Sequence, residues 1–400
     1  MKILMISDVY FPRVNGVSTS IESFRRALTR LGHSVTLICP DYPAGHEDDP
    51  AILRIRSRGV LTDPEDRMMH YRRILALAPE LAAQGFDLIH VHTPFVAHYA
   101  GLALSTRLGL PVFETCHTLF EEYLHHYLTW LPASLLRFAA RRVAVRQCQT
   151  VAALISPSTP MREALVRYGV SRPISVVATG LPLEAFAAGG ESQVSAADTR
   201  RGFDIDAEAP LLLFVGRAAH EKNIAFLIEM LPRVLAYHPG ATLVVAGEGP
   251  ARQALARRAQ AAGVEASVRF VGYLARDGEL QALYRAADVF VFASRTETQG
   301  LVLLEAMALG TPVVSTAVMG TRDVLCDGEG CLVAEDDEAG FAATVNRLLD
   351  DSLLRSELAR RAVDYAGRWH EDAQAAALLE CYQAQLAPQK EVAQPSVGTT

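Results

Sequence analysis

The sequence predicts an α/β protein made of two doubly wound, Rossmann-like domains that face a central cleft. The chain has 400 residues, of which 50% are hydrophobic and 21% charged, so it is long enough for two or three domains with buried cores. Short apolar runs alternate with helical segments, and this alternation pauses at residues 178–208 before it restarts. Such runs indicate parallel strands that are buried on both faces. Because ligands bind at the carboxyl ends of such strands, we expect the functional residues there.

The first series of elements opens with a strand at residues 2–7, a loop that contains glycine, and an amphipathic helix. Apolar residues at intervals of three or four positions indicate the helix, which we expect Ser18 to cap and Gly32 to end. We interpret residues 1–178 as one domain. Its other strands are expected at residues 34–39, 87–91, 111–115, 151–156 and 174–178.

The second series defines a domain over residues 179–369. A helix at residues 370–386 is expected to fold back onto the first domain, and the polar segment 387–400, which has two prolines, is expected to be disordered. The strands of the second domain are predicted at residues 211–215, 242–246, 268–271, 289–293, 312–315 and 331–333.

Composition excludes several classes of protein. The net charge is 38 − 45 = −7, which argues against a nucleic-acid partner, and no run of about 18 apolar residues predicts a membrane-spanning helix. Six cysteines without a framework spacing or a C-x-x-C pair are typical of reduced thiols in a cytoplasmic protein. The acidic excess lies in residues 191–400, which have 19 basic and 29 acidic side chains; residues 1–190 have 19 and 16.

The densest group of candidate site residues is the segment SRTETQGLVLLEAMALGTP at residues 294–312. Glu297 and Glu305 stand eight positions apart. Between them Gly300, Leu301 and Val302 open a helix whose free N–H groups can face an anion. We expect Glu297 to accept hydrogen bonds from sugar hydroxyls and Glu305 to reach a ribose. The alternative is a capped core helix whose acids complement the helix dipole.

Two basic residues follow the first strand of the second domain. Gly216 and Arg217 end this strand, and Lys222 lies five residues further on. An arginine fork and a lysine at the end of a strand predict a clamp for a diphosphate. Taken separately, either residue can be an ordinary solvated cation.

Together these motifs resemble the retaining GT-B glycosyltransferases. The resemblance rests on the E-x₇-E segment from Glu297 to Glu305, on G-R-x₄-K from Gly216 to Lys222, and on A-G-E-G-P at residues 246–250. It implies that the second domain holds a nucleotide-sugar donor and the first an acceptor, and that the anomeric configuration is retained without a metal. No cofactor is implied, because the nucleotide sugar is a substrate.

The resemblance also suggests roles for residues outside these motifs. Gly16 matches the glycine that touches the donor phosphates, although an ordinary turn would also place a glycine there. His117 matches the histidine near the donor sugar, where it can bind a hydroxyl or support charge at the anomeric carbon. The base is expected near Gly272 and Tyr273, which do not distinguish uracil from guanine. Many members have P-N-G where this chain has A-T-G at residues 178–180, a step common among relatives that glucosylate lipids.

Two histidines at the end of a first-domain strand form a separate pattern. His90 and His92 are two residues apart on an extended strand and therefore share a face. Without a third ligand nearby they make a weak metal site, so we expect no bound metal.

The segment after His117 indicates the acceptor. Residues 123–162 contain five arginines and no acidic residue, with aromatic side chains before and among them, which suits an anionic lipid surface. The alternative is a domain helix with solvated arginines. H-T-x-x-E-E-Y at residues 117–123 is similar to the segment of diacylglycerol α-glucosyltransferases, which implies that Glu121, Glu122 and Tyr123 bind the acceptor or close the lipid-facing mouth.

We therefore predict a metal-independent, retaining hexosyltransferase that moves glucose from UDP-glucose to a lipid hydroxyl such as that of diacylglycerol. We expect it to be cytoplasmic and peripherally bound to the inner face of the membrane. The alternatives are a GDP-mannose-dependent mannosyltransferase acting on a phosphoinositide or polysaccharide precursor, and a non-catalytic nucleotide-sugar-binding protein. The residues do not name the donor sugar, the acceptor or the oligomeric state.

Overall fold

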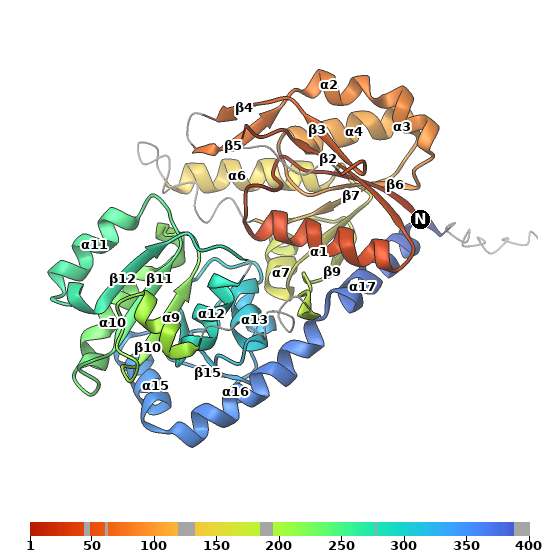
Figure 1. Cartoon of the computed structure of the whole chain (residues 1–400). Helices are drawn as coiled ribbons and strands as arrows, with labels where there is room; N and C mark the ends of the chain where they lie inside the picture. The colour runs from red at the N-terminus through yellow and green to blue at the C-terminus, as the bar shows by residue number, and fades with distance from the viewer. Residues whose placement is uncertain (44–48, 61–62, 119–132, 185–194, 277, 388–400) are drawn as a thin grey trace, which may run out of the picture.

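Two separate parallel sheets organise the chain (Figure 1). The computed structural model describes all residues except 44–48, 61–62, 119–132, 185–194, 277 and 388–400. The first sheet has the order β3-β2-β1-β6-β7-β8-β9. Its strands are β1 (Lys2–Ile6), β2 (Ser34–Pro40), β3 (Ile52–Ile55), β6 (Leu88–Val91), β7 (Val112–Thr115), β8 (Ala153–Ser156) and β9 (Ile174–Val176).

The first sheet is covered on both faces, as its apolar strands require. Ile3 and Met5 of β1 pack into one buried cluster, and Leu4 and Ile6 pack into another on the opposite face. The helices around this sheet are α1 (Gly16–Arg30), α2 (Tyr71–Ala76), α3 (Ala78–Gln84), α4 (Val96–Leu108), α6 (Ala133–Cys148) and α7 (Thr159–Arg167).

The second sheet repeats this design with the order β12-β11-β10-β13-β14-β15. The chain order reverses beside β1 in the first sheet and beside β10 in the second, which are the positions where doubly wound sheets bind ligands. The strands are β10 (Leu211–Val215), β11 (Thr242–Ala246), β12 (Val268–Gly272), β13 (Val289–Phe292), β14 (Val313–Ser315) and β15 (Cys331–Val333). The helices are α9 (Ala196–Gly202), η3 (His220–Lys222), α10 (Ile224–Leu235), α11 (Arg252–Ala261), η4 (Glu265–Ser267), α12 (Glu279–Ala286), α13 (Leu301–Ala308), α14 (Thr321–Val324), α15 (Glu338–Asp350), α16 (Ser352–Ala366) and η5 (Gly367–Trp369).

The last helix, α17 (Glu371–Leu386), lies along α1 of the first domain (Figure 1). Its residues Leu378 and Tyr382 are fully buried in the cluster that contains Ile3 and Met5. Near its start, the buried Glu371 carboxylate accepts hydrogen bonds from Arg26 and Arg30 of α1, so the end of the chain contributes to the core of the first domain.

The predicted α/β fold with two doubly wound domains is confirmed, with two local corrections. The sequence pattern does not predict β3, nor the antiparallel pair β4 (Ser57–Val60) and β5 (Asp63–Met69). The cap of α1 is Asn15 rather than Ser18. The Asn15 Oδ1 accepts from the backbone N–H groups of Val17 and Ser18, and the Ser18 hydroxyl accepts from the backbone N–H of Asn15.

Candidate active site

Lys222 and Glu297, predicted from separate motifs, form an ion pair in the second domain. Lys222 belongs to the short helix η3 after β10, and Glu297 lies in the loop between β13 and α13. The loops are joined a second time by the Asn223 amide, which donates to the Ala293 carbonyl over 3.0 Å. With side chains 24% and 15% exposed, the ammonium and the carboxylate remain reachable by a ligand. Arg217 is exposed at the end of β10.

Glu305 has a different environment from Glu297. It is 2% exposed on α13, and its carboxylate accepts hydrogen bonds from Arg276 over 2.8 Å and from the Tyr284 hydroxyl over 3.1 Å. Burial and the adjacent carboxylate raise the pKa of Tyr284 well above its usual value, so this phenol stays a donor. The E-x₇-E pair therefore combines one accessible acid with one that is held in a buried network.

Glycines let the loops at the carboxyl ends of the second sheet lie close together. A Cβ atom at Gly247 would come within 2.0 Å of the Gly216 carbonyl oxygen, and one at Gly249 within 2.4 Å of the Ala218 carbonyl oxygen. Gly300, the cap of α13, has φ +94°, a left-handed conformation that favours glycine. Packing and backbone conformation thus explain these glycines of the motifs.

Gly16, Gly272 and Tyr273 were also expected to touch the donor. Gly16 is the exposed first residue of α1, and a Cβ atom added there would meet nothing within 4 Å. Packing therefore does not explain this glycine. Gly272 is buried with φ +77°, and the next residue, Tyr273, leaves 60% of its surface exposed at the end of β12. An aromatic ring at this strand end can stack on a base.

Three histidines from two neighbouring strand ends of the first sheet form a row. The rings of His90 and His92 lie 4.1 Å apart, and the His92 Nδ1 is 3.2 Å from the Nε2 of His117. His90 is bound on both nitrogens, by the Thr115 hydroxyl over 2.7 Å and by the Tyr382 hydroxyl over 2.6 Å. Burial lowers the pKa of His90 to about 3 and that of His117 to about 4, and it lowers the pKa of His92 well below its usual value. The row is therefore neutral at physiological pH.

The two domains meet directly at these residues. The Thr298 hydroxyl, next to Glu297, donates to the backbone carbonyl of His117 over 3.0 Å. At the domain boundary the Gln299 side chain pairs with the backbone of Thr179, accepting from its N–H and donating to its carbonyl, each over 2.8 Å, and the Thr179 hydroxyl donates to Ser20 of α1 over 2.7 Å. The E-x₇-E loop of one domain is thereby fixed against the strand end that carries His117 in the other.

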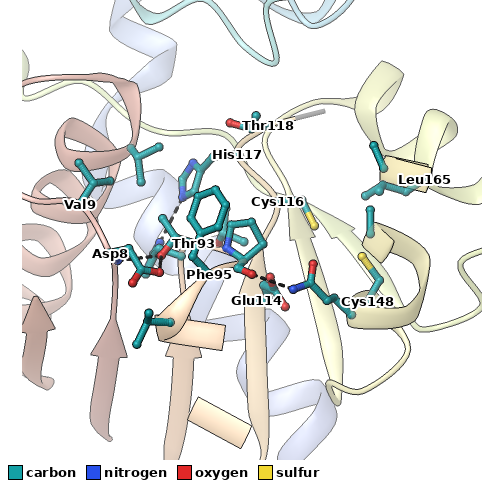
Figure 2. Close-up of a pocket in the computed structure, with 18 of the residues that line it drawn as sticks. Asp8, Val9, Thr93, Phe95, Glu114, Cys116, His117, Thr118, Cys148 and Leu165 are labelled. Atoms are coloured by element: carbon teal, nitrogen blue, oxygen red, sulfur yellow. Dashed lines mark hydrogen bonds between the residues drawn. The ribbon is translucent and has the colours of Figure 1, made fainter. Parts of the chain in front are cut away.

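A cavity of about 410 Å³ opens beside His117 in the first domain (Figure 2). In Figure 2, His117 and Thr118 stand at one end, and the sulfur atoms of Cys116 and Cys148 lie toward Leu165. Helix α6 contributes Ala140, Ala144 and Cys148 together with the longer polar side chains of Arg141 and Gln147. Most of the lining is apolar, including Val9, Val17, Val60, Met68, Phe95, Val96, Ala140, Ala144 and Leu165.

Known proteins share this architecture. The family described as "Glycosyl transferases group 1" matches residues 196–369, and "Glycosyltransferase Family 4" matches residues 14–185. An alpha-monoglucosyldiacylglycerol synthase of Streptococcus pneumoniae is 34% identical over 318 residues, which cover 79% of this chain and 71% of that protein. This chain is a GT-B glycosyltransferase.

Other comparisons agree with this assignment. A GDP-mannose-dependent alpha-mannosyltransferase of Mycobacterium tuberculosis is 30% identical to this glycosyltransferase over 337 residues, which cover 81% of each chain. The structure of Anabaena Alr3699/HepE in complex with UDP and glucose superposes with a TM-score of 0.74 at 17% identity, covering 96% of this chain and 100% of that chain. The predicted resemblance to the family is confirmed.

Sequence reasoning did not identify every residue that shapes the site of this glycosyltransferase. Thr298, Gln299 and Arg276 bear no motif signal of their own, and the His92–His117 contact depends on the pairing of β6 with β7. The predicted acceptor residues Glu121, Glu122 and Tyr123 lie outside the described residues. Within the described parts of the chain, no cluster of three or more His, Cys, Asp or Glu side chains is placed to hold a metal ion.

Proposed function

We propose that this glycosyltransferase moves glucose from UDP-glucose onto a hydroxyl of a membrane lipid such as diacylglycerol. The observation that carries the proposal is the position of α6 between the apolar cavity beside His117 and the protein surface. Ala140 and Ala144 line the cavity, and Phe138 projects from the helix with 63% of its surface exposed. An apolar acceptor near the donor site suits this arrangement, and the Streptococcus relative's name indicates the same acceptor class.

The outer face of α6 supports contact with an anionic membrane. Arg137, Arg142 and Arg146 are exposed, and at 100° per residue they occupy about half of the helix circumference, with Phe138 between them. Arg141 is also exposed, but it lines the cavity and its guanidinium lies 4.3 Å from the centre of the Tyr168 ring. Cations near an anionic surface contribute about 1 kcal/mol each before screening by salt. In the part of the chain that the structure describes, no helix is both long and apolar enough to cross a membrane. We infer reversible binding at the membrane surface.

The proposed chemistry assigns a task to each predicted site residue. Arg217 and Lys222 bind the diphosphate, Glu297 holds sugar hydroxyls, and His117 assists at the anomeric centre, with retention of configuration and without a metal. Glu305, held by Arg276, faces the ribose. These role assignments are supported by the family resemblance and by the clustering of Lys222, Glu297 and His117 around one interdomain contact.

The deciding experiment incubates the purified enzyme with UDP-glucose or GDP-mannose and with vesicles of diacylglycerol and anionic phospholipid. Mass spectrometry identifies the product, proton NMR its anomeric configuration, and a chelator arm tests for a metal. We expect an α-glucolipid from UDP-glucose, with the rate unchanged by chelator. A mannosylated product, a soluble product or no turnover would each overturn the acceptor and donor assignment.

A separate sedimentation experiment tests the membrane contact. Replacing Arg137, Arg142 and Arg146 by glutamine, and leaving the cavity residue Arg141 in place, should abolish salt-sensitive binding to anionic vesicles. The matched control removes the same charge from exposed positions of the second domain, at Arg257, Arg360 and Arg361. Equal loss of binding in the two variants would show that net charge, rather than α6, is responsible.

A further inference from the structure

In the row of three histidines, one buried nitrogen atom has no hydrogen-bond partner in the part of the chain that the structure describes. His92 is 1% exposed, and its Nε2 has no hydrogen-bond partner among the described residues. Its other nitrogen, Nδ1, faces the Nε2 of His117 at 3.2 Å. The backbone N–H of His92 donates to the Ile6 carbonyl over 3.0 Å, which fixes the backbone, and the imidazole packs between the rings of His90 and His117.

Two neutral rings joined by a hydrogen bond between the His92 Nδ1 and the His117 Nε2 can carry their protons in only two ways. In the first, the His92 Nδ1–H donates to the His117 Nε2, and the unpartnered His92 Nε2 is a bare lone pair. In the second, the His117 Nε2–H donates, and the His92 Nε2 carries a buried hydrogen that has no acceptor among the described residues. Orphaned buried N–H groups are rarer in proteins than acceptors that lack a donor, so the first arrangement is favoured.

We propose that His92 is a positioning residue that fixes His117 as the tautomer protonated on Nδ1. With its Nε2 accepting from His92, His117 presents Nδ1–H as a donor. This assigns the direction of its hydrogen bond during catalysis: His117 donates to an oxygen of the donor sugar and does not accept from a hydroxyl. The kinetic consequence rests on the proposed role of His117, but the tautomer itself does not.

The geometry also explains why the partner of His117 at position 92 is another histidine. A carboxylate or carbonyl at position 92 could only accept, which would select the opposite tautomer of His117. Imidazole supplies a donor at Nδ1 while the whole row remains uncharged, because burial keeps the pKa of each ring below the physiological range. A neutral partner avoids placing a negative charge near the expected diphosphate.

The direct test is the nitrogen spectrum of the wild-type enzyme with ¹⁵N-labelled histidine, assigned with His92→Phe and His117→Asn. We expect His117 to be protonated on Nδ1 at neutral pH. The control Thr115→Val removes the hydrogen bond to His90 one step along the row and should leave the His117 tautomer unchanged. A wild-type His117 protonated on Nε2 overturns the proposal whether or not the enzyme uses UDP-glucose.

Two substitutions of similar size then separate positioning from packing. The asparagine amide nitrogen lies as many bonds from Cα as the histidine Nδ1, so His92→Asn can still donate to His117, whereas the glutamine amide in His92→Gln reaches the place of Nε2. We expect His92→Gln to lower kcat roughly 10- to 100-fold with UDP affinity unchanged, and His92→Asn to recover most of this loss. Equal kcat values in the two variants would contradict the proposal.

Discussion

Replacing Glu297 by glutamine should change catalysis and nucleotide binding in opposite directions. In the free protein the Glu297 carboxylate is paired with Lys222, the residue assigned to the diphosphate. Binding UDP then requires Lys222 to exchange a carboxylate for a phosphate. The partly buried ion pair is worth about 1 kcal/mol, the upper part of the range for exposed pairs. Removing the carboxylate charge should therefore tighten UDP binding about fivefold.

The same substitution removes a charged acceptor for sugar hydroxyls. Hydrogen bonds to charged groups contribute about 1.5–3 kcal/mol, so kcat/KM should fall roughly 10- to 150-fold. Calorimetry with UDP and steady-state kinetics measure the two effects. The control Glu357→Gln removes an equal charge from α16, where Glu357 pairs with Arg360 and Arg361, and should change neither. Unchanged or weaker UDP binding in Glu297→Gln would refute the exchange of partners at Lys222.

Three further predictions concern the donor site and the histidine row. Arg217→Ala and Lys222→Ala should each weaken UDP binding, measured by calorimetry, roughly 10- to 150-fold. Unchanged affinity in both variants would refute the assignment of these two residues to the diphosphate. Gly16→Ala should leave the melting temperature unchanged or higher, because the site has room for a methyl group, yet weaken UDP binding; a lower melting temperature with normal binding would assign Gly16 a structural role. The pKa of His117 is about 4 in the folded protein and about 6.5 unfolded, so the unfolded chain binds more protons in this window. The contribution of neutral His117 to the free energy of unfolding should be complete above pH 6.5 and should fall as the pH drops toward 4. In urea unfolding, the midpoint of His117→Asn should therefore depend less steeply on pH than that of the wild type.

Strands buried on both faces could be located from the sequence because their composition leaves little choice. The run LLLFV at Leu211–Val215 and the run KILMI at Lys2–Ile6 form β10 and β1. The strand β5, with sequence DPEDRMM, could not be located in this way. It pairs only with β4, in a two-stranded hairpin held by backbone hydrogen bonds, so it needs no continuous apolar run.

The strand-end rule predicted that His117, Arg217 and Glu297 follow the carboxyl ends of strands, and in the structure they follow β7, β10 and β13. It could not show which polar groups pair at those strand ends. The ion pair between Glu305 and Arg276 joins residues 29 positions apart, and the contact from Thr298 to His117 joins residues 181 apart. Such pairs depend on how loops and domains pack, which a local pattern does not encode.

The A-T-G step at residues 178–180 shows how packing changes the interpretation of a motif. Gln299 binds only the backbone of Thr179, so this contact tolerates different side chains, while the Thr179 hydroxyl donates to Ser20 of α1 over 2.7 Å. Gly180 is required, because a Cβ atom there would lie 2.4 Å from the Cα of Glu371 at the start of α17. The step therefore serves the junction of the two domains with α17. These contacts explain both the glycine of the step and the hydroxyl of Thr179 by packing at the domain boundary.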